Sequence, residues 1–329
     1  MNLRPGRFVA ALLIFPAVMA AAGPHQRFAW LANDPANTYD AATLAGIRDV
    51  VGVLKATVDP FYAGFDPTVQ LAQCHAALVS GLYDGLFIEA ADGVAIEPCV
   101  AEAKQHHVPV VATDLPIGPD ANNVQPQVPN EVGASFIMSS RWGNGVKAVT
   151  PLVCQGLNPC NVLYLAGGLT FGFDLLGLQG LNDAIAANHT IMLVGAAEAY
   201  WDTATAREVM IAQLAAHPEI NVVIASGDQM ALGTQQAAVA AGKTLRIVGA
   251  GGGASAIAAV KAGKWFATFN GLPRTEGQLG AGMMELHLAS PNVKPFGLDP
   301  VAVSGLPDIW TQTTLAQHPT FVPQWPGPQ

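Results

Sequence analysis

The most constraining feature of this sequence is a regular alternation of short and long apolar patterns over residues 189–270. Between short apolar runs lie longer segments whose apolar residues recur every three or four positions, which is the period of an amphipathic helix. The short runs predict buried strands at 191–194, 222–225, 245–248 and 266–269. Strands that alternate with helices build a parallel sheet covered on both faces. The sequence therefore predicts an α/β fold with a doubly wound parallel sheet.

The same alternation covers most of the remaining chain. Further strands are predicted at 28–32, 85–89, 108–114, 161–166 and 301–303, with an irregular or extended segment at 61–66. Helices are predicted at 41–53, 67–80, 95–106, 130–153, 170–187 and 275–290. The tail beyond them shows no helical or strand period. At 329 residues the chain exceeds the size at which one core usually keeps growing, so we expect two lobes. Segment 115–129, rich in Pro, Asn and Gln, is the expected first crossing between them.

The first 22 residues have the pattern of a cleavable signal peptide. Arg4 and Arg7 precede an apolar run at 8–19, which ends in three alanines. The run is short for a membrane span, and a buried N-terminal helix is the alternative interpretation. No cysteine follows the run, so a lipid anchor is not expected. The sequence predicts an exported, periplasmic protein.

The charge of the chain excludes two classes of partner. Without Arg4 and Arg7 it carries 13 basic and 24 acidic residues, a net charge of −11. No cluster of Lys and Arg interrupts this acidic balance. Nucleic acid and anionic membranes attract proteins through such clusters, so neither is an expected partner.

The four cysteines fit an exported protein with two disulfides. Cys154 and Cys160 flank a short loop between a predicted helix and strand, while Cys74 and Cys99 lie on neighbouring predicted helices. Four cysteines allow three pairings, and this spacing favours Cys74 with Cys99 and Cys154 with Cys160. No CxxC or His/Cys spacing indicates zinc, so we predict neither a metal nor another cofactor.

Several predicted strands stop at a residue that can face a ligand. They end at Trp201, at Gly227 with Asp228, at Gly251 and at Asn270, and in open parallel sheets ligands bind beyond the carboxyl ends of the strands. Each has a plainer interpretation. Trp201 can fill a core, and Asp228 can cap the helix that follows it. The glycine run at 249–253 lacks the spacing and the acidic partner of a dinucleotide site.

Three stretches of the sequence together resemble a known protein family. These are YDGLFIEAADGVAIEPCVAEAKQHHVPVVATD, YWDTATAREVM with LAAHPEINVV, and ASGDQMALGTQQAAVAAGK, along with an N-terminal loop that holds Asn37 and Tyr39. In this order they resemble the type I periplasmic solute-binding proteins of sugar ABC transporters, the ribose and galactose binders. The similarity covers nearly all of the chain beyond the signal peptide.

The resemblance implies two doubly wound parallel-sheet lobes joined by three hinge crossovers, with a ligand held in the cleft between them. The crossovers are expected near Ile117, Gly271 and Ser304. One lobe then comprises residues 27–116 plus 271–303, and the other 117–270 plus 304–329. A monomer that delivers a small-molecule ligand to a membrane permease is expected. A ligand-sensing partner of a membrane receptor or kinase is the alternative. No nucleophile with a base and no catalytic carboxylate pair emerges, so no enzyme activity is predicted.

The resemblance also implies site residues. The expected ligand-binding set combines polar and aromatic side chains: Asn37, Tyr39, Asp114, Trp201, Asp228 and Asn270. At four other positions the chain departs from the sugar binders, which carry Arg, Arg, Asn and Asp where this chain has Leu115, Gly177, Gly227 and Gly251. The sequence therefore predicts a wider, less polar cleft and a ligand that is bulkier or less hydroxylated than a pentose or hexose.

Overall fold

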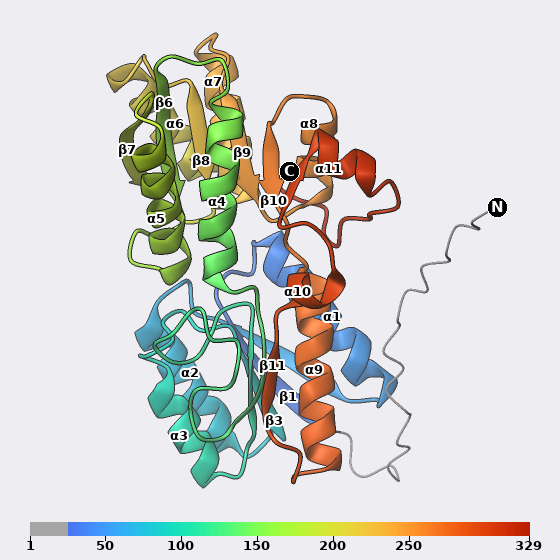
Figure 1. Ribbon diagram of the computed structural model, residues 1–329. Coiled ribbons are helices and arrows are strands. Elements are labelled where there is room, and N and C mark those ends of the chain that lie inside the picture. Colours follow the sequence, from blue (N-terminus) through green and yellow to red (C-terminus); the bar gives the residue numbers. More distant parts are fainter. Residues whose placement is uncertain (1–25) are drawn as a thin grey trace, which may run out of the picture.

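The computed structural model describes residues 26–329, and the predicted signal peptide lies outside the described residues. Two six-stranded sheets, each flanked by helices, form two lobes stacked end to end (Figure 1). The strand order is β11-β5-β4-β3-β1-β2 in the first sheet and β12-β10-β9-β8-β6-β7 in the second. Within residues 26–329 no helix is long and apolar enough to cross a bilayer.

The first lobe contains only parallel strand pairs. Its strands are β1 (Arg27–Ala32), β2 (Thr57–Tyr62), β3 (Gly85–Ile88), β4 (Val110–Thr113), β5 (Glu131–Ser135) and β11 (Phe296–Leu298). Its helices are α1 (Thr38–Val53), α2 (Pro67–Ser80), α3 (Glu97–Gln105), α9 (Pro273–Ala289) and α10 (Pro300–Ser304). One face of the sheet packs on α2 and α3, and the other on α1 and α9.

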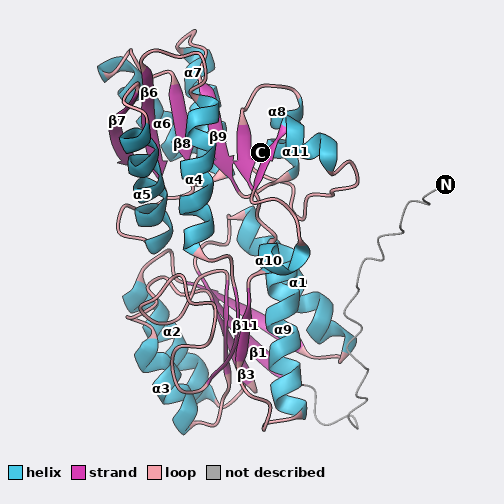
Figure 2. Cartoon of the chain, viewed as in Figure 1, coloured by secondary structure: helices cyan, strands magenta, loops and turns pink. Residues whose placement is uncertain are grey.

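The second lobe repeats this plan with one antiparallel edge, where β12 pairs with β10. Its strands are β6 (Cys160–Ala166), β7 (Ile191–Glu198), β8 (Val222–Ala225), β9 (Arg246–Ala250), β10 (Ala267–Phe269) and β12 (Ile309–Thr311). Its helices are α4 (Ser139–Val153), α5 (Gly172–Ala187), α6 (Thr203–Ala216), α7 (Asp228–Ala240), α8 (Ala254–Lys261) and α11 (Gln312–Gln317). Figure 2 shows its strands between layers of helix.

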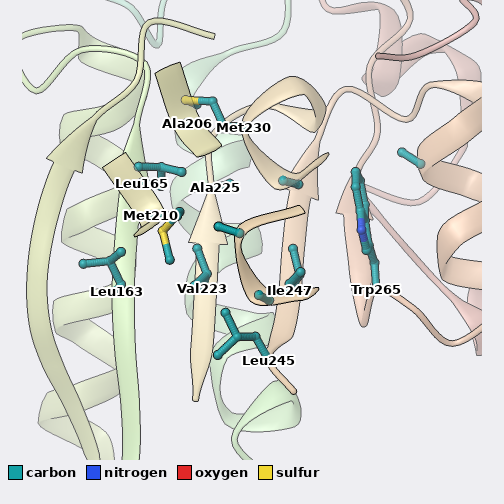
Figure 3. Close-up of a cluster of buried hydrophobic side chains, with 14 of the residues drawn as sticks. Leu163, Leu165, Ala206, Met210, Val223, Ala225, Met230, Leu245, Ile247 and Trp265 are labelled. Carbon is teal, nitrogen blue, oxygen red and sulfur yellow. The ribbon is translucent and has the colours of Figure 1, made fainter. Parts of the chain in front are cut away.

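The central strands are apolar along their whole length because both faces of each sheet are covered. All four residues of β8 are buried, and its neighbours β6 and β9 are almost as enclosed. On one face Leu163, Val223 and Ile247 occupy neighbouring strands and pack under α6 and α7 (Figure 3). The two sheets and the helices on their faces confirm the predicted doubly wound α/β fold.

Four local predictions are wrong. The helix predicted over 130–153 starts only at Ser139, because Glu131–Ser135 form β5 and pair with β4 of the first sheet. The chain therefore first crosses between sheets after Ser135, not near Ile117. The strand predicted at 301–303 is helix α10, which Asp299 caps by accepting a hydrogen bond from Ala302 N (3.0 Å). The tail, predicted to be irregular, contributes β12 and α11.

Both predicted disulfides are present. Cys74 and Cys99 join α2 to α3, with their Cα atoms 5.9 Å apart. Cys154 and Cys160 close the short turn between α4 and β6, with a Cα separation of 5.5 Å. The first bond ties together the two helices that cover one face of the first sheet, and the second fixes the entry into β6.

The end of the chain contacts both lobes. Gln324 donates from Nε2 to Thr275 Oγ1 on α9 of the first lobe (2.6 Å). Next to it, Trp325 donates from Nε1 to the carbonyl oxygen of Gly251 in the second lobe (2.7 Å). Trp325 also packs edge-on against Tyr39, with ring centroids 5.6 Å apart. Residues 324–325 therefore lie across the junction between the lobes.

Candidate functional site

A cavity of about 510 Å³ lies between the carboxyl ends of the two sheets. Its walls come from the loops that follow β1, β2, β3 and β4 in the first lobe, and β6, β7, β8 and β9 in the second. Every one of these loops leaves a parallel strand at the same edge of its sheet, where chain geometry gathers side chains toward a common point. The cavity is thus the natural ligand site of this fold.

Three aromatic rings from both lobes form one wall. Phe65 follows β2 in the first lobe, whereas Phe171 and Trp201 follow β6 and β7 in the second. Phe65 stacks on Trp201 with ring centroids 5.4 Å apart, and Phe171 meets Trp201 edge-on at the same distance. We call these three rings the aromatic wall. It offers a large apolar surface and links the lobes directly.

The backbone holds two of these rings in unfavourable conformations. Phe65 and Trp201 have φ angles of 61° and 51°, in the left-handed region that bulky residues rarely adopt. Such conformations cost on the order of 1–3 kcal/mol and persist where the surroundings enforce them, often at ligand sites. Trp201 is further fixed because its Nε1 donates to the carbonyl oxygen of Ser226 (3.0 Å).

A polar contact crosses the cleft beside these rings. Asn37 caps α1 by accepting a hydrogen bond from Tyr39 N (2.9 Å), and the same oxygen accepts one from Gln229 Nε2 of the second lobe (2.9 Å). Tyr39 points its hydroxyl away from this contact and donates to Glu276 Oε2 (3.1 Å). Both Asn37 and Tyr39 line the cavity, so the first loop supplies one amide and one phenol.

Carboxyl groups gather on the first-lobe wall. Oxygen atoms of Asp40, Glu89 and Asp114 lie within 4.8 Å of one another, and all three residues line the cavity. Burial raises the pKa of Asp114 to about 6 and raises the pKa values of Asp40 and Glu89 well above their usual range. The like charges of the cluster add to this effect. We call these three residues the carboxyl cluster.

Two of the predicted ligand residues do not line the cavity. Asp228 is fully buried beneath it, where Oδ1 accepts from Thr268 Oγ1 (2.6 Å) and Oδ2 from Gly253 N (2.9 Å). Burial raises the pKa of Asp228 to about 7, although these hydrogen bonds lower it. Asn270 is also fully buried and donates from Nδ2 to the carbonyl oxygen of Pro307 (3.0 Å). Both side chains brace the strand ends around the site.

The four residues that differ from those of the sugar-binding proteins have different surroundings. Leu115, Gly227 and Gly251 line the cavity. A Cβ atom added at Gly227 would lie 2.7 Å from Cδ1 of Trp201, and one at Gly251 would lie 2.7 Å from Cζ2 of Trp325. Indole rings therefore fill the space that these glycines leave.

Gly177 lies away from the cavity lining, contrary to its predicted role in widening the cleft. A Cβ atom there would overlap Tyr164 and Trp142, which pack directly over α5. Trp142 donates to the hydroxyl of Tyr164 (2.9 Å), and that hydroxyl donates to Asp174 Oδ1 (3.0 Å). The glycine thus accommodates a buried hydrogen-bonded chain that supports the loop carrying Phe171.

The sequence analysis missed Phe65, Phe171, Asp40, Glu89 and Gln229, all of which line the cavity. A signal existed for part of this set. Glu89 closes a predicted strand, and both phenylalanines lie in short loops between a strand and a helix, which is where such a fold places its ligand contacts. Nothing local distinguishes Asp40 or Gln229, because each lies inside the first turn of a helix.

Comparisons with known proteins agree on the fold. A family model described as a periplasmic binding protein domain matches residues 28–291. The ribose import binding protein of Haemophilus influenzae is 30% identical over 216 residues, which cover 65% of this chain and 69% of that protein.

Two solved structures share the fold at low sequence identity. The myo-inositol binding protein of Caulobacter has a TM-score of 0.75 at 19% identity, covering 90% of this chain and 96% of that one. The periplasmic binding protein of the arabinose ABC transporter from Shewanella sp. ANA-3 has a TM-score of 0.76 at 19% identity, covering 89% of this chain and 94% of that one.

Proposed function

The chain belongs to the periplasmic binding protein family, and from this premise we propose that it captures a small molecule between its lobes and delivers it to the permease of an ABC transporter. The periplasm is the proposed location, and the protein acts as a monomer without a catalytic step. Its relatives include a ribose import binding protein, which supports a role in import.

One observation carries this proposal: the lobes touch each other around a cavity that residues of both lobes line. Phe65 of the first lobe stacks on Trp201 of the second, and Gln229 of the second lobe donates to Asn37 of the first. The cavity between them, about 510 Å³, falls in the range of small-molecule sites. A ligand that contacts both lobes favours the closed arrangement by its differential affinity for it.

We infer that the two lobes separate through changes in backbone angles at the three segments where the chain crosses between them. We place the first lobe at residues 26–135 plus 273–304 and the second at 139–269 plus 309–329, with hinges in the segments between them. The ligand then enters when the aromatic wall separates, since Phe65 moves with one lobe and Trp201 with the other. Hinged closure of this kind changes few backbone angles.

The capture step is tested on the protein purified without added ligand. Native mass spectrometry is expected to detect a bound small molecule, and titration calorimetry with that molecule gives its affinity. Trp201→Ala should weaken binding at least about tenfold, because a buried aromatic contact contributes on the order of 1.5–3 kcal/mol. Tyr200→Ala is the matched control, since Tyr200 is an exposed neighbour outside the lining.

Unchanged affinity in Trp201→Ala would refute binding in this cleft. The delivery step is tested separately by measuring uptake of the identified molecule in cells that lack this protein or the permease. Loss of uptake in both strains supports import. Normal uptake with an altered cellular response instead indicates the sensing role.

A further inference from the structure

The charged residues that line the cavity are all acidic. Within residues 26–329 the lining contains four carboxyl groups, those of Asp40, Glu89, Asp92 and Asp114, and no Lys, Arg or His. Asp40 and Glu89 are each only 2% exposed. A further carboxyl group, that of Glu276, is buried and accepts a hydrogen bond from the hydroxyl of Tyr39. The first-lobe wall is therefore an acidic surface whose lining, in the described part of the chain, holds no balancing cation.

The hydrogen bonds of this surface are incomplete. Glu89 Oε1 accepts from Asn33 Nδ2 (2.9 Å), but Glu89 Oε2 has no partner among residues 26–329, although it is buried at the cavity. Asp40 Oδ2 accepts only a long bond from Asp34 N (3.2 Å). A buried acceptor without a partner costs on the order of 1–3 kcal/mol, and more when it is charged. A ligand that brings N–H donors and positive charge removes this cost.

The aromatic wall of the same cavity suits the same kind of ligand. The ring centroids of Phe65, Phe171 and Trp201 lie 5.4–6.4 Å from one another. Aromatic faces attract cations, and they also cover an apolar ligand body. A cavity lined by both a carboxyl cluster and an aromatic wall thus favours a molecule with a cationic end and an apolar or partly apolar remainder.

Building on the proposed capture function, we propose that the ligand is a protonated primary or secondary amine. Its ammonium group binds the carboxyl cluster of Asp40, Glu89 and Asp114, and its body lies against the aromatic wall of Phe65, Phe171 and Trp201. The unpartnered oxygen of Glu89 can accept a hydrogen bond from this ammonium group, whereas a quaternary ammonium has no N–H to donate.

Proton release should accompany binding. Burial raises the pKa values of Asp40, Glu89 and Glu276 well above normal and that of Asp114 to about 6, so the empty site releases its protons at higher pH than ordinary carboxyl groups do. Asp34, Asp299, Tyr39 and Tyr62 also face this cluster; Asp299 raises the pKa of Glu276 further, whereas the hydrogen bond from Asp34 N lowers that of Asp40. An ammonium group favours the ionised carboxylates, so amine affinity should rise with pH through this range.

The experiment uses matched pairs of probes on the full mature protein: phenethylamine against phenethyl alcohol, and glucosamine against glucose. Calorimetric titration should detect an amine binding at least about tenfold more tightly than its neutral partner. In two buffers of different ionisation enthalpy, the amine should release protons. The trimethylated form of phenethylamine should bind more weakly than phenethylamine.

Two variants locate the effect. Glu89→Gln and Asp114→Asn should each weaken amine binding by about 10–100-fold, because each loses a charge-assisted hydrogen bond. Glu208→Gln, which removes the same charge from the exposed face of α6, should leave it unchanged. Circular dichroism of each variant establishes that it is folded.

Four results would overturn the amine assignment. They are equal binding of amine and alcohol, equal binding of the trimethylated probe, stabilisation by calcium or magnesium chloride alone, and no binding by any amine. If glucose or the alcohol binds at least as tightly as its amine partner and Trp201→Ala abolishes this binding, the capture function stands while the amine class falls. If native mass spectrometry and both probe classes find no binding, the capture function itself falls.

Discussion

Among single residues, Asp228 shows most clearly how the strand ends are held together. It lies at the start of α7, yet its carboxyl group binds β10 through Thr268 and the loop after β9 through Gly253. One side chain therefore links three neighbouring segments of the second lobe directly beneath the cavity. Its role in this arrangement is to stabilise the loops rather than to contact the ligand.

Asp228→Ala should lower the free energy of unfolding by about 1–3 kcal/mol, because Thr268 Oγ1 and Gly253 N lose their buried acceptor. Urea denaturation measures the change. Thr268→Ala should also destabilise the protein, and the double variant should lose less than the sum of the two, since both remove the same contact. Strictly additive losses would show that the two side chains do not act together.

Residue-level prediction placed residues at the cavity where they follow a strand, and it misplaced a residue whose surroundings depend on packing between elements. Trp201 and Asp114 both line the cavity, and each follows a strand that its apolar run already marked. Gly177 was misplaced because its environment depends on Trp142 and Tyr164, which reach α5 from other elements. No local pattern reports such a contact.

Pairs of helices in each lobe pack backbone to backbone. In the first lobe α1 meets α9 at Gly46 and Gly277, where an added Cβ atom would overlap carbonyl groups of the opposite helix. In the second, α4 meets α5 at Gly143 and Gly180 in the same manner. The α1–α9 contact joins the first helix of the first lobe to a helix that follows strands β6–β10 of the second lobe, so it closes the first lobe on itself.

Gly46→Ala should lower the free energy of unfolding by about 1–3 kcal/mol, because its methyl group would push α9 away from α1. Gly52→Ala in the same helix has no atom within 4 Å of the new methyl group. It should leave stability unchanged or raise it by up to about 1 kcal/mol, since alanine favours helix more than glycine does. Equal losses in the two variants would contradict close packing as the cause.

Most elements were predictable because buried strands and amphipathic helices carry their own periods. Strand β5 was not, because five residues of mixed character precede a helix and their burial depends on α9, which lies about 140 residues later. Helix α10 did carry a signal: Asp299 caps it and Pro300 opens it, a combination typical of helix starts. The apolar run at 301–303 led instead to the prediction of a strand.

At the scale of the whole molecule, buried acids set the dependence of stability on pH. Burial raises the pKa values of Asp114 and Asp174 to about 6 and those of Glu131 and Asp228 to about 7. In the unfolded chain the same groups titrate near pH 4. Between these values the folded protein holds more protons than the unfolded chain, so its stability decreases as pH rises.

The melting temperature of the ligand-free protein should therefore fall between about pH 4 and about pH 7, each group contributing about 1.4 kcal/mol per unit of pKa difference. Scanning calorimetry at constant ionic strength measures this. Asp228→Asn should flatten the curve near pH 7, since it removes one of these groups. A melting temperature that rises over this interval would contradict the burial of these acids in protonated form.

The stack of Phe65 on Trp201 has a practical consequence. Of the six tryptophans, five are at most 3% exposed, and Trp201 alone is only partly buried. When the halves part, this indole loses its phenyl neighbour and meets water. Trp325 then keeps only one of its contacts with Tyr39 and Gly251, while the other four tryptophans stay within their packed surroundings. The emission of Trp201 should then shift to the red, giving the unlabelled protein an optical readout of whether its binding compartment is occupied.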